Sequence, residues 1–354
     1  MPQTVLIFRT GQLGDTLVSM PAIHAIRRHH PGCTVVLLTD RHPGSGFVSS
    51  WDVLGQSGWI DEVEFYVPGS GILGMWRNAA QLSARLRGRS VTHAYLLTSG
   101  RTSWQRWRDR LFVRAVIGAR HCHDASGPPG SRKAADGSLV RLEPEWRRLL
   151  DAIPVDGGDG FALPISPAAG REAEVALAAI GSLDDALLVA FGPGSKMPAK
   201  VWPAERYQEV GRRLLAARDN VRLVVLGGPE DVAVGNSLCA AWGSRSHNLA
   251  GRVSVMAGAA VLRHCSAYVG NDTGTMHLAA LAGVPCVALF SARDHPGKWE
   301  PYGEGHAVLR REVDCAGCML EVCSEHGNKC LNLITVEEVL DAVEDVLHPK
   351  GGQR

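Results

Sequence analysis

The stretch Val269-Gly-Asn-Asp-Thr-Gly-Thr-Met-His277 decides the fold that we expect for this chain. It continues as Leu278-Ala-Ala-Leu-Ala-Gly283 and Val284-Pro-Cys-Val-Ala-Leu-Phe290. The pattern indicates a strand that ends in a Gly/Asp/Thr turn, a short apolar helix that stops at Gly283, and another buried strand. Proteins of the α/β class use such turns to present backbone N–H groups to an anion. We therefore expect a phosphate-bearing ligand at this turn.

A second turn of the same kind lies near the N-terminus, where the apolar strand 4–8 meets Gly11-Gln-Leu-Gly14-Asp15-Thr16 and a helical pattern. Further apolar runs separated by helical patterns lie at 34–39, 62–67, 91–97, 186–191, 221–226, 267–270 and 284–290. Strands that alternate with helices are typical of parallel sheets. The sequence thus predicts an α/β protein with two Rossmann-like parallel-sheet domains that face a central cleft.

The domain limits follow from length and composition. A chain of 354 residues suits two domains of ordinary size. A segment rich in Pro and Gly at roughly 151–170 reads as the linker. We expect an N-terminal domain at 1–160, a C-terminal domain at 161–334, and a C-terminal helix and tail at 335–354, where Thr335 and Glu338 form a capping box.

Charge and hydropathy narrow the class of protein. Lys and Arg number 37 and Asp and Glu number 36, so the sequence lacks the basic excess of a nucleic-acid-binding protein. No apolar run approaches the 18 or so residues that a membrane-spanning helix needs. Met1-Pro-Gln-Thr leads into a strand without a leader pattern. We expect a cytoplasmic protein that binds no nucleic acid.

Asp15 lies in the first strand-to-helix turn, at the edge of the sheet where ligands bind in open α/β folds. A carboxylate there suits a general base. It also suits a helix cap, a role that Asp often has. Gly11 and Gly14 alone make a weak nucleotide motif, because the third glycine of the dinucleotide fingerprint is missing.

The loop Gly192-Pro-Gly-Ser195-Lys196-Met-Pro-Ala-Lys200 follows a strand in the second series. Its glycines allow close approach of a ligand, Ser195 offers a hydroxyl, and the two lysines place positive charge where a diphosphate could lie. The alternative for Lys196 is an ordinary surface lysine. Lys200 is the stronger candidate, because Trp202-Pro203 marks the entry to the next helix.

Two further turns carry candidate ligand contacts. Glu230 and Asp231 follow a strand and could accept the ribose hydroxyls of a nucleotide, or cap a helix. Thr273 and the backbone amides from Gly274 onward can donate to phosphate, whereas Asp272 would repel phosphate and suits sugar hydroxyls or a cap. His277 follows one turn into the helix, as a structural histidine or as a phosphate or sugar contact.

Taken in this order, these motifs resemble glycosyltransferase family 9, the heptosyltransferase-like family, over both halves and most strongly over 186–300. The resemblance implies a GT-B architecture, with the acceptor on the N-terminal domain and ADP-heptose on the C-terminal one. It also implies inversion at the anomeric carbon without a catalytic metal. Asp15 would then be the general base, while Lys200, Ser195, Thr273 and the amides after Gly274 would stabilise the leaving ADP and Asp272 would hold the sugar.

The acceptor stays open, because members of this family act on lipopolysaccharide core, capsule, protein and secondary-metabolite acceptors. Gly14, Arg101 and Arg106 are the candidates for acceptor contacts. The run Arg101-Thr-Ser-Trp104-Gln-Arg106-Trp107-Arg108-Asp-Arg110 could serve an anionic lipid-linked acceptor or touch the inner membrane surface, or be the solvated side of a helix.

Four of the nine cysteines are clustered as Cys315, Cys318, Cys323 and Cys330, with His326 among them. This spacing can surround a tetrahedral ion, so a structural zinc or iron site is one interpretation. Free thiols and disulfides are the alternatives, and disulfides do not suit a reducing compartment.

Two other functions share the predicted fold. One is a sugar-nucleotide epimerase, which would need more acid and base residues than the sequence identifies. The other is a non-catalytic sugar-nucleotide-binding or scaffold protein, against which Asp15 and Lys200 both argue.

Overall fold

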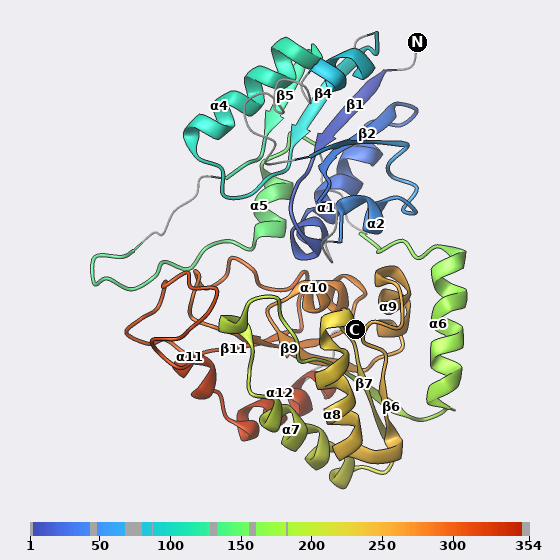
Figure 1. Ribbon diagram of the computed structural model, residues 1–354, viewed down its shortest axis with the longest axis vertical. Helices are drawn as coiled ribbons and strands as arrows, with labels where there is room; N and C mark the ends of the chain where they lie inside the picture. Colours follow the sequence, from blue (N-terminus) through green and yellow to red (C-terminus); the bar gives the residue numbers. More distant parts are fainter. Residues whose placement is uncertain are drawn as a thin grey trace. The chain divides into compact units, whose positions relative to one another are not determined.

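The structure is a computed structural model that describes residues 3–42, 48–67, 80–86, 88–127, 133–155, 161–181 and 183–348 (Figure 1). The chain forms two compact units. Unit 1 comprises residues 1–130 and 145–164, and unit 2 comprises residues 131–144 and 165–354. The segment 131–144 therefore belongs to unit 2 although unit 1 surrounds it in sequence. The sequence analysis placed the boundary between the domains after residue 160. Residues 156–160 lie outside the described part of the chain.

Unit 1 contains a parallel sheet in the order β3-β2-β1-β4-β5. Its elements are β1 (Thr4–Phe8), α1 (Leu13–His29), β2 (Thr34–Asp40), α2 (Ser50–Leu54), β3 (Glu62–Tyr66), β4 (Val91–Leu96), α4 (Ser103–Leu111), the π-helix η1 (Phe112–Ile117), β5 (His121–Asp124) and α5 (Glu145–Asp151). Successive side chains of a strand point to opposite faces of the sheet. Leu6 of β1 accordingly packs in a cluster with Leu82 and Val113.

Unit 2 contains a second parallel sheet in the order β11-β10-β9-β6-β7-β8. Its strands are β6 (Leu187–Gly192), β7 (Val221–Val225), β8 (Ser246–Asn248), β9 (Ala267–Asn271), β10 (Cys286–Phe290) and β11 (Ala307–Arg310). Its helices are α6 (Pro167–Ile180), η2 (Pro198–Lys200), α7 (Ala204–Ala217), η3 (Pro229–Asp231), α8 (Val232–Trp242), η4 (Gly243–Arg245), α9 (Val255–Leu262), α10 (Gly274–Leu281), α11 (Lys329–Asn332) and α12 (Val336–Leu347).

One face of the unit 2 sheet packs in a single apolar cluster. Alternate residues of the central strands, such as Phe191 and Val269, pack against Trp202 and Tyr207 and against Val343 of α12. The central strands β6, β9 and β10 are buried on both faces, as the continuous apolar runs of the sequence predict for a parallel sheet. Thr335 caps α12 by accepting a hydrogen bond from the N–H of Glu338, and the Glu338 side chain bonds back to it.

The predicted fold class, α/β with two parallel sheets, is confirmed. The sequence prediction did not include β5, β8 and β11, which are short edge strands. It also placed the end of the linker at 170, whereas α6 begins at Pro167 with Ser166 as its N-cap. Among the described helices, none is long and apolar enough to cross a bilayer.

Both sheets have a topological switch point. The first strand of each unit, β1 or β6, has the next strand on one side and a later strand, β4 or β9, on the other. Ligands of open α/β sheets bind at such a point, beyond the carboxyl ends of the strands. The turns after β1 and β4 in unit 1, and after β6 and β9 in unit 2, are therefore where the functional side chains should lie.

Candidate functional site

At the switch point of unit 2, two glycines on neighbouring strands leave room for the side chain of Tyr268. Gly192 of β6 pairs with Gly270 of β9. A Cβ atom added to Gly192 would lie 1.9 Å from the hydroxyl of Tyr268, and one added to Gly270 would lie 2.3 Å from it. Burial raises the pKa of Tyr268 well above its usual range, so the phenol is neutral. The two glycines are thus needed to seat this ring where the ligand loops begin.

Asn271, the last residue of β9, joins two of these loops. Its side-chain amide donates to the carbonyls of Pro193 at 2.7 Å and Gly194 at 3.3 Å. Its Oδ1 accepts from the backbone N–H of Trp202 at 3.1 Å and from the Tyr207 hydroxyl at 2.8 Å. Asn271 is completely buried. It therefore fixes both ends of the 193–202 loop against β9. The sequence did not predict this role, although Asn271 lies within the 269–277 motif.

Lys200 and Asp272 form an ion pair within unit 2. Lys200 Nζ lies 2.6 Å from Asp272 Oδ2 and 3.4 Å from the Asp272 carbonyl oxygen. Only 14% of the lysine side chain and 8% of the aspartate side chain are exposed. The sequence analysis treated the two as separate candidates, one for phosphate and one for sugar. The structure brings them together, so a ligand that attracts Lys200 also changes the surroundings of Asp272.

The start of α10 lies next to this ion pair. Thr273 is the N-cap of the helix, but its side chain makes no capping hydrogen bond. The first N–H groups of a helix have no partner within it, and its positive end favours an anion. Gly274, the first residue of α10, removes the side chain that would hinder a ligand there. His277 is buried within the helix, which is compatible with either predicted role.

The remaining donor candidates of unit 2 differ in their contacts. Ser195 is half-buried, and its Oγ accepts from the Met197 N–H at 3.1 Å. Lys196 is exposed, and its charge lowers the pKa of Asp231 against a larger rise caused by burial. Both remain next to the Gly194 turn, where a ligand could meet them.

The structure separates Glu230 from Asp231. Asp231 Oδ2 accepts from the Gly228 N–H at 2.9 Å, as expected of a cap. Its carboxylate also fills the space beside Gly194, where an added Cβ would lie 1.7 Å from Oδ1. Burial raises the pKa of Asp231. Glu230 is exposed and is the freer of the two carboxylates to meet a ligand.

In unit 1, Asp15 is the third residue of α1 and completes a capping box with Gln12. Its Oδ2 accepts from the Gln12 N–H at 3.0 Å, and its Oδ1 lies 3.3 Å from Arg9 Nη2. About a third of the Asp15 side chain is exposed, whereas Arg9 is buried. Gly11 has a φ of +116°, and a Cβ there would lie 2.7 Å from Asp15 Oδ2. Asp15 is therefore both a cap and a solvent-accessible carboxylate.

Arg9 was not predicted from the sequence, because an arginine directly after an apolar strand gives no periodic signal. Its guanidinium donates to the carbonyl of Leu97 after β4, across the switch point of unit 1. Burial lowers the pKa of Arg9, and the carboxylates of Asp15, Glu145 and Asp40 oppose this shift. Arg9 thus supplies a buried positive charge beside Asp15.

The three candidates for acceptor contacts lie in different places within unit 1. Gly14 is the second residue of α1. Arg101 donates from Nη2 to Thr10 Oγ1 at 3.2 Å, so it lies beside the turn after β1. Arg106 instead pairs with Asp124, with Nε 3.1 Å from Oδ2. Arg101 therefore shares the switch point with Asp15, whereas the charge of Arg106 is held at β5.

A buried polar cluster after β10 was also missed by the sequence analysis. Asp294 Oδ2 accepts from Lys298 Nζ at 3.0 Å and from Trp299 Nε1 at 2.9 Å. Burial alone would raise the pKa of Asp294, but these partners hold it below its usual value. The neighbouring His295 Nδ1 lies 2.8 Å from the carbonyl of Val140, and both residues belong to unit 2. The cluster thus fixes another loop at the carboxyl edge of the sheet.

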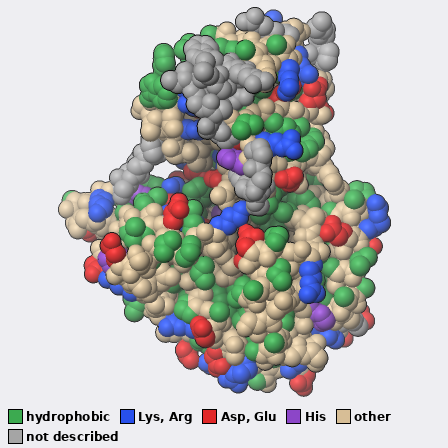
Figure 2. All heavy atoms as spheres, in the orientation of Figure 1, with side chains coloured by type: hydrophobic (Ala, Val, Ile, Leu, Met, Phe, Trp, Pro, Cys, Tyr) green, Lys and Arg blue, Asp and Glu red, His purple; other side chains and the backbone are tan. Residues whose placement is uncertain are grey.

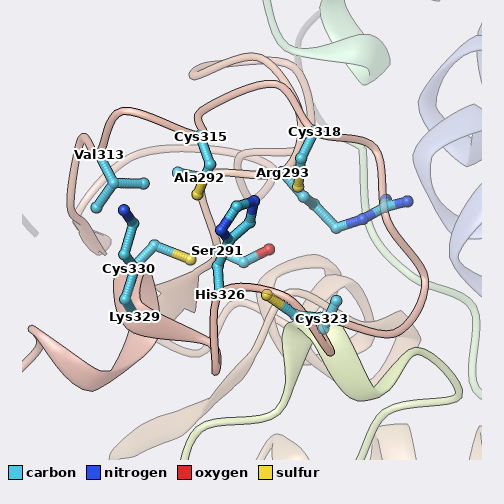
Figure 3. Close-up of a pocket in the computed structure, with 11 residues that line it drawn as sticks. Ser291, Ala292, Arg293, Val313, Cys315, Cys318, Cys323, His326, Lys329 and Cys330 are labelled. Atoms are coloured by element: carbon cyan, nitrogen blue, oxygen red, sulfur yellow. The ribbon is translucent and has the colours of Figure 1, made fainter.

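The four clustered cysteines line one cavity of about 10 Å³ together with His326 (Figure 3). This is about the space that one water molecule or one ion needs. The figure shows the four sulfur atoms around the His326 ring. All nine cysteines of the chain are free thiols, and burial raises the pKa of Cys315. Within the described ranges, no three His, Cys, Asp or Glu side chains already form a metal-binding arrangement.

The loop that carries these cysteines contacts the turn that carries Lys200. The Ala199 N–H donates to the Glu321 carbonyl at 2.9 Å. Asn328 Nδ2 donates to the Pro198 carbonyl at 3.2 Å. Pro198–Lys200 is the short helix η2. The cysteine loop therefore holds η2 by two hydrogen bonds to the peptide group between Pro198 and Ala199, next to Lys200.

Residues 164–329 match the model of glycosyltransferase family 9 (heptosyltransferase). Lipopolysaccharide heptosyltransferase 2 of Salmonella typhimurium is 29% identical over 169 residues, covering 46% of this chain and 48% of that protein. Lipopolysaccharide heptosyltransferase 2 of Escherichia coli is 33% identical over 165 residues, covering 45% and 47%. The chain thus matches about half the length of these curated relatives.

Solved structures extend the likeness to the whole fold. A family 9 glycosyltransferase from Veillonella parvula superposes with a TM-score of 0.72 at 21% identity, over 97% of both chains. Escherichia coli ADP-heptose heptosyltransferase II superposes with a TM-score of 0.68 at 18% identity, over 97% of this chain and 98% of that one. The iron-containing dodecameric glycosyltransferase TibC of enterotoxigenic Escherichia coli superposes with a TM-score of 0.51 at 15% identity, over 98% of this chain and 76% of that one. Residues 164–329 are thus similar to glycosyltransferase family 9, and the whole chain has the GT-B-like fold of the heptosyltransferases.

Proposed function

We propose that this protein transfers a heptosyl group from ADP-heptose to a hydroxyl group of a glycan or glycolipid, with lipopolysaccharide core as the first candidate acceptor. The observation that carries the proposal is the Lys200–Asp272 ion pair beside the start of α10, within the region that matches the family. A positive charge, a carboxylate and free helix amides suit a diphosphate and the sugar attached to it.

In the proposed reaction, the carboxylate of Asp15 accepts the proton of the acceptor hydroxyl while its oxygen attacks the anomeric carbon. The bond from that carbon to the β-phosphate oxygen breaks with inversion, and ADP leaves with the electron pair. Lys200, the Thr273 hydroxyl and the first amides of α10 stabilise the charge that develops on ADP. These fixed donors do the work for which other transferases use a divalent ion.

Ser195, Lys196 and Glu230 complete the proposed donor site. Ser195 and Lys196 follow the Gly194 turn, from which a hydroxyl and an ammonium group can reach phosphate. The exposed Glu230 is our candidate for the ribose hydroxyls, and Asp231 shapes the turn as its cap. Asp272 accepts from the sugar hydroxyls once the diphosphate has drawn Lys200 toward itself.

The test compares the wild-type protein with Asp15→Asn and Lys200→Met, using ADP-, GDP- and UDP-sugars with candidate acceptors in EDTA. Asn at 15 can still accept from the Gln12 N–H, so this variant keeps the cap. We expect acceptor-dependent ADP release that falls by roughly 10²- to 10⁴-fold in Asp15→Asn. The same variant should bind ADP as the wild type does, and Lys200→Met should weaken that binding.

Three outcomes would contradict the proposal in different ways. Equal rates in wild type and Asp15→Asn would remove Asp15 as the base. A sugar product formed without acceptor would indicate an epimerase. Tight ADP binding with no turnover on any acceptor would indicate a non-catalytic binding protein.

We also propose that the cysteine cavity holds one structural zinc or iron ion. Cys315, Cys318, Cys323 and Cys330 offer the soft ligands that these metals prefer, and a bound cation would favour their thiolates. The thiols do not yet stand in a binding arrangement, so the ion would draw them together. The solved structure of the fold-relative TibC contains iron.

Metal analysis of reduced, full-length protein tests this second proposal. We expect one equivalent of zinc or iron, which Cys318→Ser loses and the matched variant Cys239→Ser, in α8, retains. Because the cysteine loop holds η2, removal of the ion should also weaken ADP binding. Absence of metal from the wild type after growth with either ion, or equal content in both variants, would refute the site.

A further inference from the structure

Helix α4 presents its apolar side to solvent. Trp104 is 62% exposed, Trp107 is 60% exposed and Leu111 is 48% exposed. Residues spaced by three and four positions lie on one side of a helix, so these three form one stripe. Two tryptophan side chains exposed to this degree present about 300 Å² of largely apolar surface. Patches of this size on a soluble protein commonly mark an interaction site.

The polar side of α4 faces unit 1 and is held there by ion pairs. Arg106 and Arg110 both contact Asp124 of β5, at 3.1 Å and 2.6 Å. The buried Asp109 contacts Arg108 at 2.6 Å and lies 3.8 Å from Arg101. A rotation of the helix that buried its tryptophans would break these contacts. The outward position of the stripe is therefore fixed by the structure of unit 1.

Positive charge surrounds the stripe. Residues 101–124 contain six arginines and two aspartates, which gives them a net charge of +4. The Arg108 guanidinium lies over the Trp104 ring, 5.3 Å from its centroid. Arg114 and Arg120, just beyond α4, are exposed. Figure 2 shows hydrophobic side chains at the surface beside the edge where Figure 1 places α4.

This combination selects one kind of partner. Tryptophan rings favour the interface between lipid and water, and arginines favour lipid phosphates. A second copy of the same face would oppose two positive patches, so charge disfavours a symmetric dimer. An anionic bilayer satisfies the rings and the charges together.

We propose that α4 docks this protein peripherally on an anionic lipid bilayer. Trp104, Trp107 and Leu111 enter the headgroup region, while Arg108 and Arg114 contact lipid phosphates. The docking goes beyond the proposed transferase reaction and does not depend on it. It would hold the protein at the surface on which a lipid-linked acceptor is found.

Cosedimentation of the full chain with vesicles tests the proposal. The vesicles are phosphatidylcholine alone or mixed with an equal amount of phosphatidylglycerol. We expect binding to the mixed vesicles that falls as salt rises. Trp104→Ser/Trp107→Ser should abolish it, and Arg114→Gln should weaken it by roughly fivefold. Val175→Ser is the matched control, because Val175 is 75% exposed on α6 in unit 2.

The double variant removes only exposed rings, so its thermal unfolding should match the wild type, as should its ADP affinity and its rate with a soluble acceptor. These readouts separate failure of docking from failure of the transferase proposal. Equal vesicle binding by the wild type and the double variant would overturn the proposal, as would no binding to mixed vesicles. A dimer in light scattering that the double variant converts to a monomer would assign the stripe to a second copy and overturn it as well.

Discussion

Lys200 and Asp272 form an ion pair of 2.6 Å in which neither side chain is more than 14% exposed. A buried charge that loses its partner is costly, whereas removing both charges together costs little. The pair is therefore a stable resting state of the candidate donor site, and a diphosphate must compete with Asp272 for the lysine.

The first prediction concerns this competition. Asp272→Asn should lower the free energy of unfolding by about 2–4 kcal/mol, because it leaves Lys200 unpaired. Lys200→Met/Asp272→Asn should cost less than the sum of the two single variants. ADP should restore part of the lost free energy of unfolding in the single variant Asp272→Asn but not in the double variant. Only the single variant keeps a Lys200 that has lost its carboxylate partner and can bind phosphate. Denaturant unfolding with and without ADP measures these differences, and strict additivity would contradict the coupling.

The second prediction concerns Asn271. Asn271→Ala removes four hydrogen bonds, so we expect a loss of about 2–4 kcal/mol and a weaker affinity for ADP, because the 193–202 loop loses its attachment to β9. Asn220→Ala, which removes one bond from an exposed side chain to the Asp185 carbonyl, is the control and should leave ADP affinity unchanged. Calorimetric titration of ADP decides the matter, and equal affinity in both variants would refute the positioning role.

The third prediction uses two glycines with opposite expected effects. Gly192→Ala should destabilise the protein by about 1–3 kcal/mol, because the new Cβ would overlap the Tyr268 hydroxyl. Tyr268→Phe in the same chain should recover part of that loss by removing the oxygen. Gly170→Ala, inside α6 with nothing within 4 Å of the new Cβ, should stabilise the protein by about 0.5–1 kcal/mol. Thermal unfolding that moves in the same direction for both glycine variants would contradict this reading.

The fourth prediction concerns pH and unit 1. The ring of His30, at the end of α1, lies 2.8 Å from the Tyr95 hydroxyl and next to the His93 and His29 rings. Burial, followed by the neighbouring histidines His93, His29 and His123, lowers the pKa of His30 to about 4. The unfolded chain, with an ordinary histidine pKa near 6.5, then binds more protons than the folded one. The free energy of unfolding should therefore fall as the pH drops from about 6.5 to about 4. Below about pH 4, His30 should cause no further change.

His30→Gln tests the assignment, because glutamine can still meet the Tyr95 hydroxyl but does not titrate. Between pH 7 and pH 4, the free energy of unfolding of the variant should fall by about 2 kcal/mol less than that of the wild type. Unfolding midpoints followed across this range measure the difference. Parallel pH profiles for the two proteins would show that His30 is not the group responsible.

Much of the fold could be read from the sequence, because central parallel strands are apolar on both faces. The runs at 4–8, 34–39 and 221–226 correspond closely to β1, β2 and β7. The run at 62–67 also corresponds to the edge strand β3, but the edge strands β5, β8 and β11 were not recognisable. β5 reads His121-Cys-His-Asp124, and its side chains are exposed or half-buried, so it carries no apolar run. Such a strand forms because β4 offers it backbone partners, which is a tertiary effect.

The candidate site was predictable residue by residue but not as contacts. Glycines, a helix start and charged residues after strands identified the turns that carry Asp15, Lys200 and Thr273. Arg9 and Asn271 were missed in their roles, because each acts through partners distant in sequence: Leu97 for Arg9, and Pro193 and Trp202 for Asn271.

The sequence by itself determined the two α/β series and the positions of the ligand turns, and it carried the resemblance to a family, because strand hydrophobicity and turn chemistry are local properties. Only the tertiary structure decided that Lys200 and Asp272 neutralise each other, that Asp231 is a cap while Glu230 is exposed, and that α4 turns its tryptophans outward. Those outcomes depend on which charges the folded chain brings within a few ångströms, and a pattern along one chain does not contain that information.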